Sequence, residues 1–325
     1  MAILKASTEN IQLAIRCLEN GGLVGMPTET VYGLGADASN PDAVKRIFAA
    51  KNRPENHPLI VHLANIEQLE NWAQEIPESA FKLARHFCPA PLAFILKKRA
   101  EVSEIVTGGQ NTVALRIPNH SVALELLHQF GRGIAAPSAN RFCRISPTQA
   151  SHVADELGRD VDLILDGGAC HIGVESTIID LSTDKPLLLR FGQITRSELE
   201  MVLETDVFVP DSLIQTTVRT AGMMAVHYAP TTPAFRCETA LLLEQLNNNM
   251  QKIGVLTCGS IIPATKTRTV IQLPVDSVNY AQNLYAKLRE LDALKLDFIV
   301  IEQPPQGEAW HAINDRLSKA TREID

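Results

Sequence analysis

Hydroxyl groups and two nearby cations give one early stretch of the sequence the clearest potential for chemistry. Residues 27–35 read PTETVYGLG, and Lys51 and Arg53 follow after a short helical segment. A strand that runs into hydroxyl and glycine residues presents backbone N–H groups at a sheet edge, where ligands of open α/β sheets bind. Pro54 stops the helix, so both cations lie on an irregular segment and can face a polyphosphate. Turn formation and compensation of the helix dipole are the alternative explanations.

A second strand end of the same kind lies far along the chain. Residues 133–137 form an apolar strand that leads into Ser138 and Asn140, although such a turn is also ordinary turn chemistry. In the strand at 113–117, apolar residues alternate with Arg116, which therefore points away from the apolar face. Arg116 can pair equally well with a structural carboxylate or with a carboxylate or phosphate of a ligand.

Regular elements must hold these residues in place. Asn40 and Pro41 predict a helix start, and Thr195 with Glu198 forms a capping box for another helix. Apolar periodicity predicts further helices at 7–20, 66–87 and 121–130, and strands at 23–26, 59–63, 92–96, 163–165, 174–181 and 187–190.

The length of 325 residues predicts two domains. We expect a first domain at 1–208, a linker or lid at 209–233 where periodicity disappears, and a second domain at 234–325. In the second domain, strands at 253–257, 269–273 and 298–302 alternate with helices at 280–291 and 308–321, which indicates a small βαβ domain. Gly254 and Gly259 have P-loop spacing without the lysine, and we interpret them as a strand-to-turn transition.

Composition narrows the class of protein. No apolar signal core or membrane-length apolar run is visible, so we expect a cytoplasmic protein without membrane contact. The net charge of −7 argues against broad contact with nucleic acid. Six scattered cysteines without a Cys-x-x-Cys pair predict free thiols, and no cluster suggests a metal site built by the protein.

Taken together, the motifs resemble those of the threonylcarbamoyl-AMP synthases in their long, two-domain form. The resemblance covers nearly the whole chain and rests on ordered segments at 27–34, Lys51 with Arg53, 58–62, Ser138 with Asn140, 173–177, 227–230 and 312–317. It implies an α/β fold, a YrdC-like twisted open sheet with helices, followed by a smaller Rossmann-like domain.

The resemblance also implies an activity. The protein would condense L-threonine, bicarbonate and ATP to threonylcarbamoyl-AMP with release of pyrophosphate. A separate tRNA threonylcarbamoyl transferase complex would then use the product to modify tRNA. Mg²⁺ would be held mainly by the phosphates of ATP, as is common.

Site residues follow from the family motifs, position by position. Lys51, Arg53, Ser138 and Asn140 would be catalytic, and His227 with Tyr228 would belong to a lid. The resemblance implies that ATP contacts Lys51, Arg53, His57, Thr112, Ser138, Ser146, Arg190 and Tyr228. It implies that L-threonine contacts Thr30, His62, Arg116, Ala136 (through its backbone) and Ser176.

Two functions of other kinds remain as alternatives. A double-stranded RNA-binding module, with weak RNA binding, would use the basic concavity of the same fold, but the acidic net charge disfavours it. A carbamoyltransferase of the hydrogenase-maturation type uses related adenylate chemistry. That class carries zinc-binding Cys-x-x-Cys pairs, which this sequence lacks.

Overall fold

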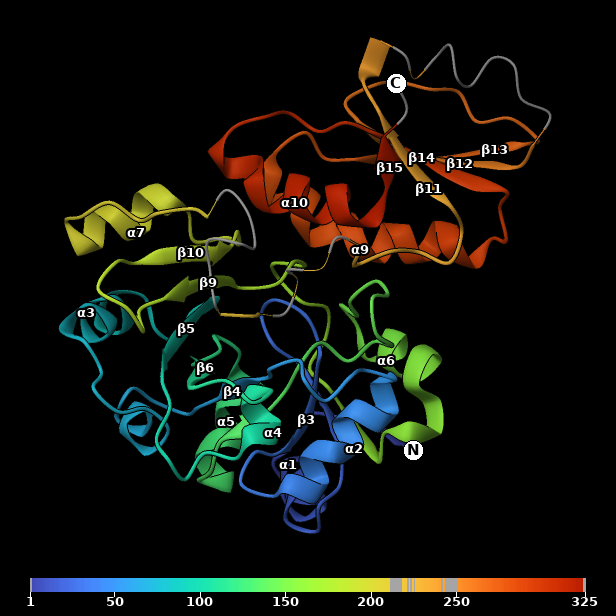
Figure 1. Ribbon diagram of the computed structural model, residues 1–325. Coiled ribbons are helices and arrows are strands. Elements are labelled where there is room, and N and C mark those ends of the chain that lie inside the picture. Colours follow the sequence, from blue (N-terminus) through green and yellow to red (C-terminus); the bar gives the residue numbers. More distant parts are fainter. Residues whose placement is uncertain are drawn as a thin grey trace. The chain divides into compact units, whose positions relative to one another are not determined.

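The chain forms two compact units, which share the sequence in an interleaved way. The computed structural model describes residues 2–210, 218–220, 222, 224, 226–240, 242 and 251–323. The first unit comprises Met1–Phe142, Pro147–His171 and Glu175–Met223, and the second comprises Cys143–Ser146, Ile172–Val174 and Met224–Asp325 (Figure 1). Part of the predicted lid, at 211–217, 221, 223 and 225, lies outside the described residues.

A mixed sheet of ten described strands organises the first unit, in the order β1-β8-β2-β3-β7-β4-β6-β5-β9-β10 (Figure 1). Its strands are β1 (Ala2–Lys5), β2 (Val24–Met26), β3 (Gly33–Asp37), β4 (Ile60–His62), β5 (Leu92–Lys97), β6 (Thr112–Arg116), β7 (Ile134–Ala135), β8 (Leu163–Asp166), β9 (Thr177–Asp180) and β10 (Leu187–Arg190).

Helices connect these strands, and their ends follow the sequence signals. They are α1 (Thr8–Glu19), α2 (Pro41–Lys51), α3 (Glu78–Phe87), α4 (Glu104–Thr107), α5 (Ser121–Phe130), α6 (Ala150–Leu157) and α7 (Arg196–Leu203), with 3₁₀ turns η1 (Glu67–Asn71) and η2 (Gly158–Asp160). The Asn40 side chain caps α2, and the Thr195–Glu198 capping box opens α7, as predicted. Asn52 ends α2 in the left-handed conformation with φ of 51°.

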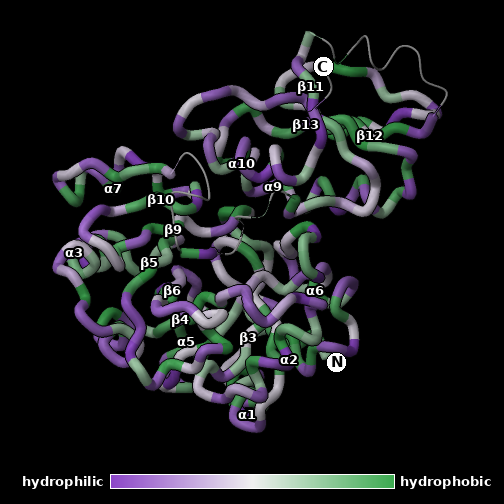
Figure 2. The backbone as a smooth tube through the Cα atoms, viewed as in Figure 1, coloured by the Kyte–Doolittle hydropathy of each residue, from purple (hydrophilic) through white to green (hydrophobic). Residues whose placement is uncertain are grey.

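Strand alternation divides the middle of the sheet into two unlike faces. On β6, Val113 and Leu115 belong to the main hydrophobic core, whereas Thr112, Ala114 and Arg116 point to the other side. That other face is covered by a small apolar cluster that includes Ile95, Ile178 and Val218. Much of β5 is green in Figure 2, because both of its faces are apolar. The expectation that Arg116 leaves the apolar face is therefore confirmed.

The second unit contains a parallel sheet in the order β13-β12-β14-β11-β15. Its elements are β11 (Ala234–Cys237), β12 (Ile253–Cys258), β13 (Arg268–Leu273), α9 (Ser277–Ala293), β14 (Phe298–Glu302), η4 (Glu308–Trp310), α10 (His311–Ala320) and β15 (Arg322–Glu323). The predicted alternation of strands and helices is confirmed. Gly254 lies inside β12 and Gly259 directly follows it, which is the expected strand-to-turn transition.

Three differences separate the structure from the sequence expectations, and the first two have a physical cause. The predicted helix at 66–87 is broken into η1 and α3, because Pro77 can only precede the first turn of α3. Strand β3 was not expected because Gly33 and Gly35 weaken strand propensity, yet a side chain at Gly35 would press on Ile134 and Met26. Strand pairing begins at Thr177, so residues 174–176 are loop. None of the described helices is long and apolar enough to cross a bilayer.

Candidate active site

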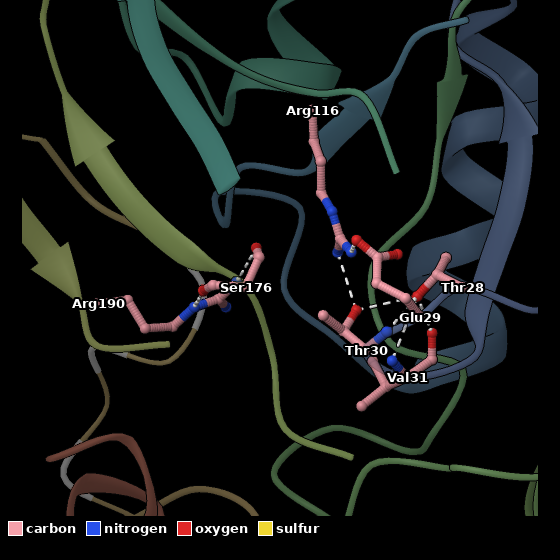
Figure 3. A network of polar contacts seen from close by, with 7 residues as sticks. All are labelled: Thr28, Glu29, Thr30, Val31, Arg116, Ser176 and Arg190. Atoms are coloured by element: carbon pink, nitrogen blue, oxygen red, sulfur yellow. Dashed lines mark hydrogen bonds and ion pairs between the residues drawn. The ribbon is translucent and has the colours of Figure 1, made fainter. Parts of the chain in front are cut away.

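A threonine-centred turn forms one wall of the candidate site. The Thr28 hydroxyl donates to the carbonyl of Val31 at 2.6 Å and accepts from the backbone N–H groups of Thr30 and Val31. Because its single proton is used, the 2.9 Å contact between the two threonine hydroxyls must have Thr30 as donor. Figure 3 shows these bonds as dashed lines within the turn. They brace the backbone of residues 28–31, between β2 and β3.

Arg116 reaches this turn from the last position of β6. Its Nη1 donates to the Thr30 hydroxyl at 2.9 Å, and its Nη2 lies 2.7 Å from Oε1 of Glu29 (Figure 3). Both charged side chains are 5% exposed. Either a structural carboxylate or a carboxylate or phosphate of a ligand was expected beside Arg116, and the structure places a carboxylate of the chain itself there. Glu29 was not identified from the sequence as a site residue.

His62 is the partner of Arg116 in the parallel pairing of β4 and β6. The side chain is buried. Burial, with a further contribution from the Arg116 charge, lowers the pKa of His62 to about 3. The imidazole is therefore neutral throughout the physiological range.

Ser176 and Arg190 form a second polar group at the site. Arg190 Nε donates to the Ser176 carbonyl at 2.8 Å, and its Nη2 donates to the Ser176 hydroxyl at 3.0 Å. In Figure 3 this pair lies opposite the group formed by Arg116, Glu29 and Thr30. Ser176, which was predicted to contact L-threonine, is thus in direct contact with Arg190, which was predicted to contact ATP.

Lys51 joins the two strand-end motifs that the sequence placed far apart. Its ammonium group is buried and donates to the carbonyls of Ser138 and Asn140, each at 2.5 Å. The Lys51 carbonyl in turn accepts from the N–H of Phe142 at 2.8 Å. Three of the four predicted catalytic residues therefore meet, and Lys51 fixes the shape of the serine turn.

Arg53 and His57 lie on the segment that follows α2. Arg53 Nη2 donates to the carbonyl of Pro58 at 2.8 Å. His57 packs edge-on against Phe142, with ring centroids 5.3 Å apart. Partial burial, followed by the positive charges of Arg53 and Arg219, lowers the pKa of His57. The neighbourhood is thus strongly cationic.

Arg219 is a cation of this neighbourhood that was not identified from the sequence. The side chain of Gln110 brackets its backbone, accepting from the Arg219 N–H at 2.6 Å and donating to its carbonyl at 3.1 Å. Arg219 Nη2 donates to the Gly108 carbonyl at 2.7 Å. A small pocket is lined by residues that include Arg219 and the predicted ATP residue Thr112. Arg219 lies in the stretch at 209–233, where the sequence shows no periodicity, so no pattern marked it.

Strand geometry relates the two halves of the site. Thr112 and Arg116 lie on one face of β6, four residues apart, which corresponds to about 13 Å along the strand. Ala136 lies next to the same strands, since its N–H donates to the carbonyl of Ile60 at 3.0 Å. The face can therefore hold a carboxylate at one end and a polyphosphate nearer the other.

Ser146, His227 and Tyr228 belong to the second unit. Tyr228 is buried, stacks on Tyr285 at 6.0 Å between centroids and lies 5.3 Å below the guanidinium of Arg316. Its φ of 61° is costly for a residue with a side chain and is typical of functional segments. The buried Arg316 packs on Tyr228, so at least this residue of the 312–317 motif has a structural role.

Ser146 is positioned by helix α9. Arg289 donates to the carbonyl of Ile145, and its Nε lies 3.5 Å from the Ser146 carbonyl. No cluster of three or more His, Cys, Asp and Glu side chains able to hold a metal occurs among the described residues.

Comparison with known proteins is consistent across sequence and structure. A family profile described as "Telomere recombination" matches residues 16–192, and the profile of the threonylcarbamoyl-AMP synthase C-terminal domain matches residues 194–321. The threonylcarbamoyl-AMP synthase of Pyrococcus abyssi is 40% identical, over 96% of this chain and 94% of its own. That of Bacillus subtilis is also 40% identical, over 98% and 94%. The crystal structure of P. abyssi Sua5 complexed with L-threonine superposes with a TM-score of 0.91 and 38% identity, covering 100% of both chains.

Proposed function

Because this chain belongs to the threonylcarbamoyl-AMP synthase family, we propose that it condenses L-threonine, bicarbonate and ATP to threonylcarbamoyl-AMP and releases pyrophosphate. The observation that carries the proposal is the face of β6 that bears Arg116 at one end and Thr112 at the other. Such a face can hold an amino acid next to a nucleotide, which turns a reaction between separate molecules into one between neighbouring groups.

The threonine subsite comprises Thr30, His62, Arg116, Ala136 and Ser176. A planar guanidinium is suited to bidentate recognition of the substrate carboxylate. The neutral His62 offers a hydrogen-bonding group beside it without adding charge. The solved relative with bound L-threonine supports threonine as the ligand of this site.

The ATP subsite comprises Lys51, Arg53, His57, Thr112, Ser138, Ser146, Arg190 and Tyr228, with Lys51, Arg53, Ser138 and Asn140 as its catalytic core. The contacts of Lys51 with the Ser138 and Asn140 carbonyls support a positioning role, in which the lysine holds the serine turn in place. Arg53, two residues after Lys51, supplies positive charge on the segment that follows α2. Fixed donors of this kind stabilise charge that develops on a departing pyrophosphate.

The reaction needs two bonds to form. The threonine ammonium group first releases a proton to solvent, the neutral amine attacks the carbon of bicarbonate and water leaves. The carbamate oxygen then attacks the α-phosphorus of ATP while pyrophosphate departs. Charge neutralisation and alignment dominate phosphoryl chemistry of this type. The phosphate oxygens are hard ligands of the kind Mg²⁺ prefers, so the metal enters on ATP.

The remaining parts of the proposal concern the surroundings of the reaction. The segment at 209–233, with His227 and Tyr228, acts as a lid that keeps water from the labile adenylate. The product passes to a transferase complex that modifies tRNA, and the enzyme works in the cytoplasm.

A direct assay tests the function. The protein is incubated with ATP, Mg²⁺, bicarbonate and labelled threonine, and pyrophosphate and the labelled adenylate are measured together. We expect both products in equal amounts, each dependent on threonine and bicarbonate. Pyrophosphate without labelled adenylate, or neither product, would contradict the proposal. Arg116→Ala serves as the matched control, since it should abolish use of threonine.

A further inference from the structure

Glu29 is a buried carboxylate whose hydrogen-bonding capacity is unused. It is 4% exposed and forms an ion pair with Arg116 at 2.7 Å. Neither of its two carboxylate oxygens accepts a hydrogen bond from the part of the chain that the structure describes. The opposing Arg116 is also incomplete, because its Nε and Nη2 find no hydrogen-bond acceptor there.

A buried ion pair with unsatisfied hydrogen-bonding groups destabilises the folded protein unless a ligand supplies the missing hydrogen bonds. A carboxylate has about four lone-pair positions, and buried charged groups in native proteins are almost always hydrogen-bonded. The attraction of Arg116 offsets the loss of water only partly, since a buried ion pair needs further hydrogen bonds to repay desolvation. The oxygens of Glu29 accept no hydrogen bond from the described residues, and they therefore suit a ligand with several N–H donors.

The charges of this pair are complementary to the carboxylate and the ammonium group of an α-amino acid. Arg116 offers a cation to a carboxylate, and Glu29, next to it, offers an anion to an ammonium group. A zwitterion placed against the pair leaves the net charge of the site unchanged. After carbamoylation the substrate nitrogen retains one N–H, so Glu29 still has a donor to bind.

We infer that Glu29 binds the α-amino group of the threonine substrate and thereby restricts the site to α-amino acids. This inference rests on the proposed function, since it names a further contact within the same threonine subsite. The alternative is that Glu29 only balances the charge of Arg116 and never touches the substrate.

A pair of ligands separates these roles. The probe is the 2,3-dihydroxybutanoate of matching stereochemistry, which has a hydroxyl where L-threonine has its amino group. We measure binding of both ligands calorimetrically, without ATP, to the wild-type protein, to Glu29→Gln and to the surface control Glu19→Gln. A site that hydrogen-bonds an N–H group rejects an analogue lacking it strongly, so the wild type should prefer threonine by about 100-fold or more.

The inference predicts that Glu29→Gln reduces this preference to less than about 10-fold by weakening threonine binding alone, and that Glu19→Gln keeps it. Equal weakening of both ligands by Glu29→Gln would overturn the inference and leave a charge-balancing role. If Glu29→Gln does not fold, the wild type still decides, because equal affinity for both ligands excludes an amino-group contact. A wild type that binds threonine but makes no adenylate would refute the proposed function alone.

Discussion

Two buried glutamates, one in each unit, show how differently the same side chain can be used. Glu29 lies in the first unit with no hydrogen bond to its oxygens from any described residue. Glu302 ends β14 in the second unit and is 2% exposed. Its Oε1 accepts from the hydroxyls of Thr239 and Ser260, and its Oε2 accepts from the N–H groups of Cys258 and Ser260.

The position of Glu302 makes the contrast informative. From the carboxyl end of β12 the chain continues to β13, whereas from that of the neighbouring β14 it continues to β15 on the other side. Ligands of open α/β sheets bind where strand connections diverge in this way. In the second unit the carboxylate of Glu302 accepts the backbone N–H groups of Cys258 and Ser260 at this position. Hydrogen-bond satisfaction therefore separates a structural carboxylate from one available to a substrate.

The largest expected effect lies in the first unit. Lys51→Ala removes the ammonium group that holds the Ser138 and Asn140 carbonyls. Loss of a preorganised charge partner costs about 2.7–4 kcal/mol in the transition state, so turnover should fall about 10²- to 10³-fold. Steady-state adenylate formation measures this, and full activity would remove the proposed role of Lys51.

A substitution of the buried glutamate in the second unit should change the stability of the protein and not its substrate preference. Glu302→Gln replaces one acceptor oxygen by a donor that faces an existing donor, which should lower the free energy of unfolding by about 1–3 kcal/mol. Urea denaturation followed by circular dichroism measures the change. The preference for threonine over the dihydroxy analogue should be unaltered. A changed preference would break the distinction between the two glutamates.

Acid sensitivity offers a third test, again in the first unit. The pKa of His62 is about 3 in the folded protein, below its ordinary value of 6.5, so the unfolded chain binds the extra proton between these values. The stabilising contribution of neutral His62 is complete above pH 6.5 and is lost as the pH falls, by about 1.4 kcal/mol per pH unit. Unfolding of wild type and His62→Asn at pH 7, 6 and 5 should show a shallower decline in the variant. Parallel declines would exclude His62 as the cause.

The smallest expected effect concerns residues 143–146, a short segment that belongs to the second unit. Arg289→Gln removes hydrogen bonds to the Ile145 and Ser146 carbonyls, each worth about 1 kcal/mol. The KM for ATP should therefore rise roughly 3- to 10-fold, while the KM for threonine stays constant. Lys287→Gln on the same helix, whose partner is the exposed Glu290, is the control. An unchanged KM for ATP in Arg289→Gln would show that the loop holds its shape without this contact.

Local signals predicted much of the fold and part of the site. Two helix starts were predicted correctly, one from Asn40 with Pro41 and the other from Thr195 with Glu198. Alternation on β6 correctly placed Arg116 away from the core. These features succeed because neighbouring residues determine them.

The features that the sequence did not reveal depend on distant contacts. Glu29 looks like an ordinary turn residue, and only its burial beside Arg116 marks it as unusual. Arg219 has no periodicity around it and is located by Gln110, far away in the sequence. The inclusion of 143–146 and 172–174 in the second unit is invisible to any local pattern.

That interleaving determines what a single cut in the backbone can achieve. Gly173 adopts a φ of 83°, and a side chain there would collide with the backbone of Ala281 and Gln282 on α9. The Cys143 carbonyl likewise accepts from the N–H of Ala229. A polypeptide beginning at residue 224 lacks these partners, and the complementary fragment carries them without α9. The second unit is therefore built from three stretches of the chain, and a cut before residue 224 separates two of them from the rest of that unit.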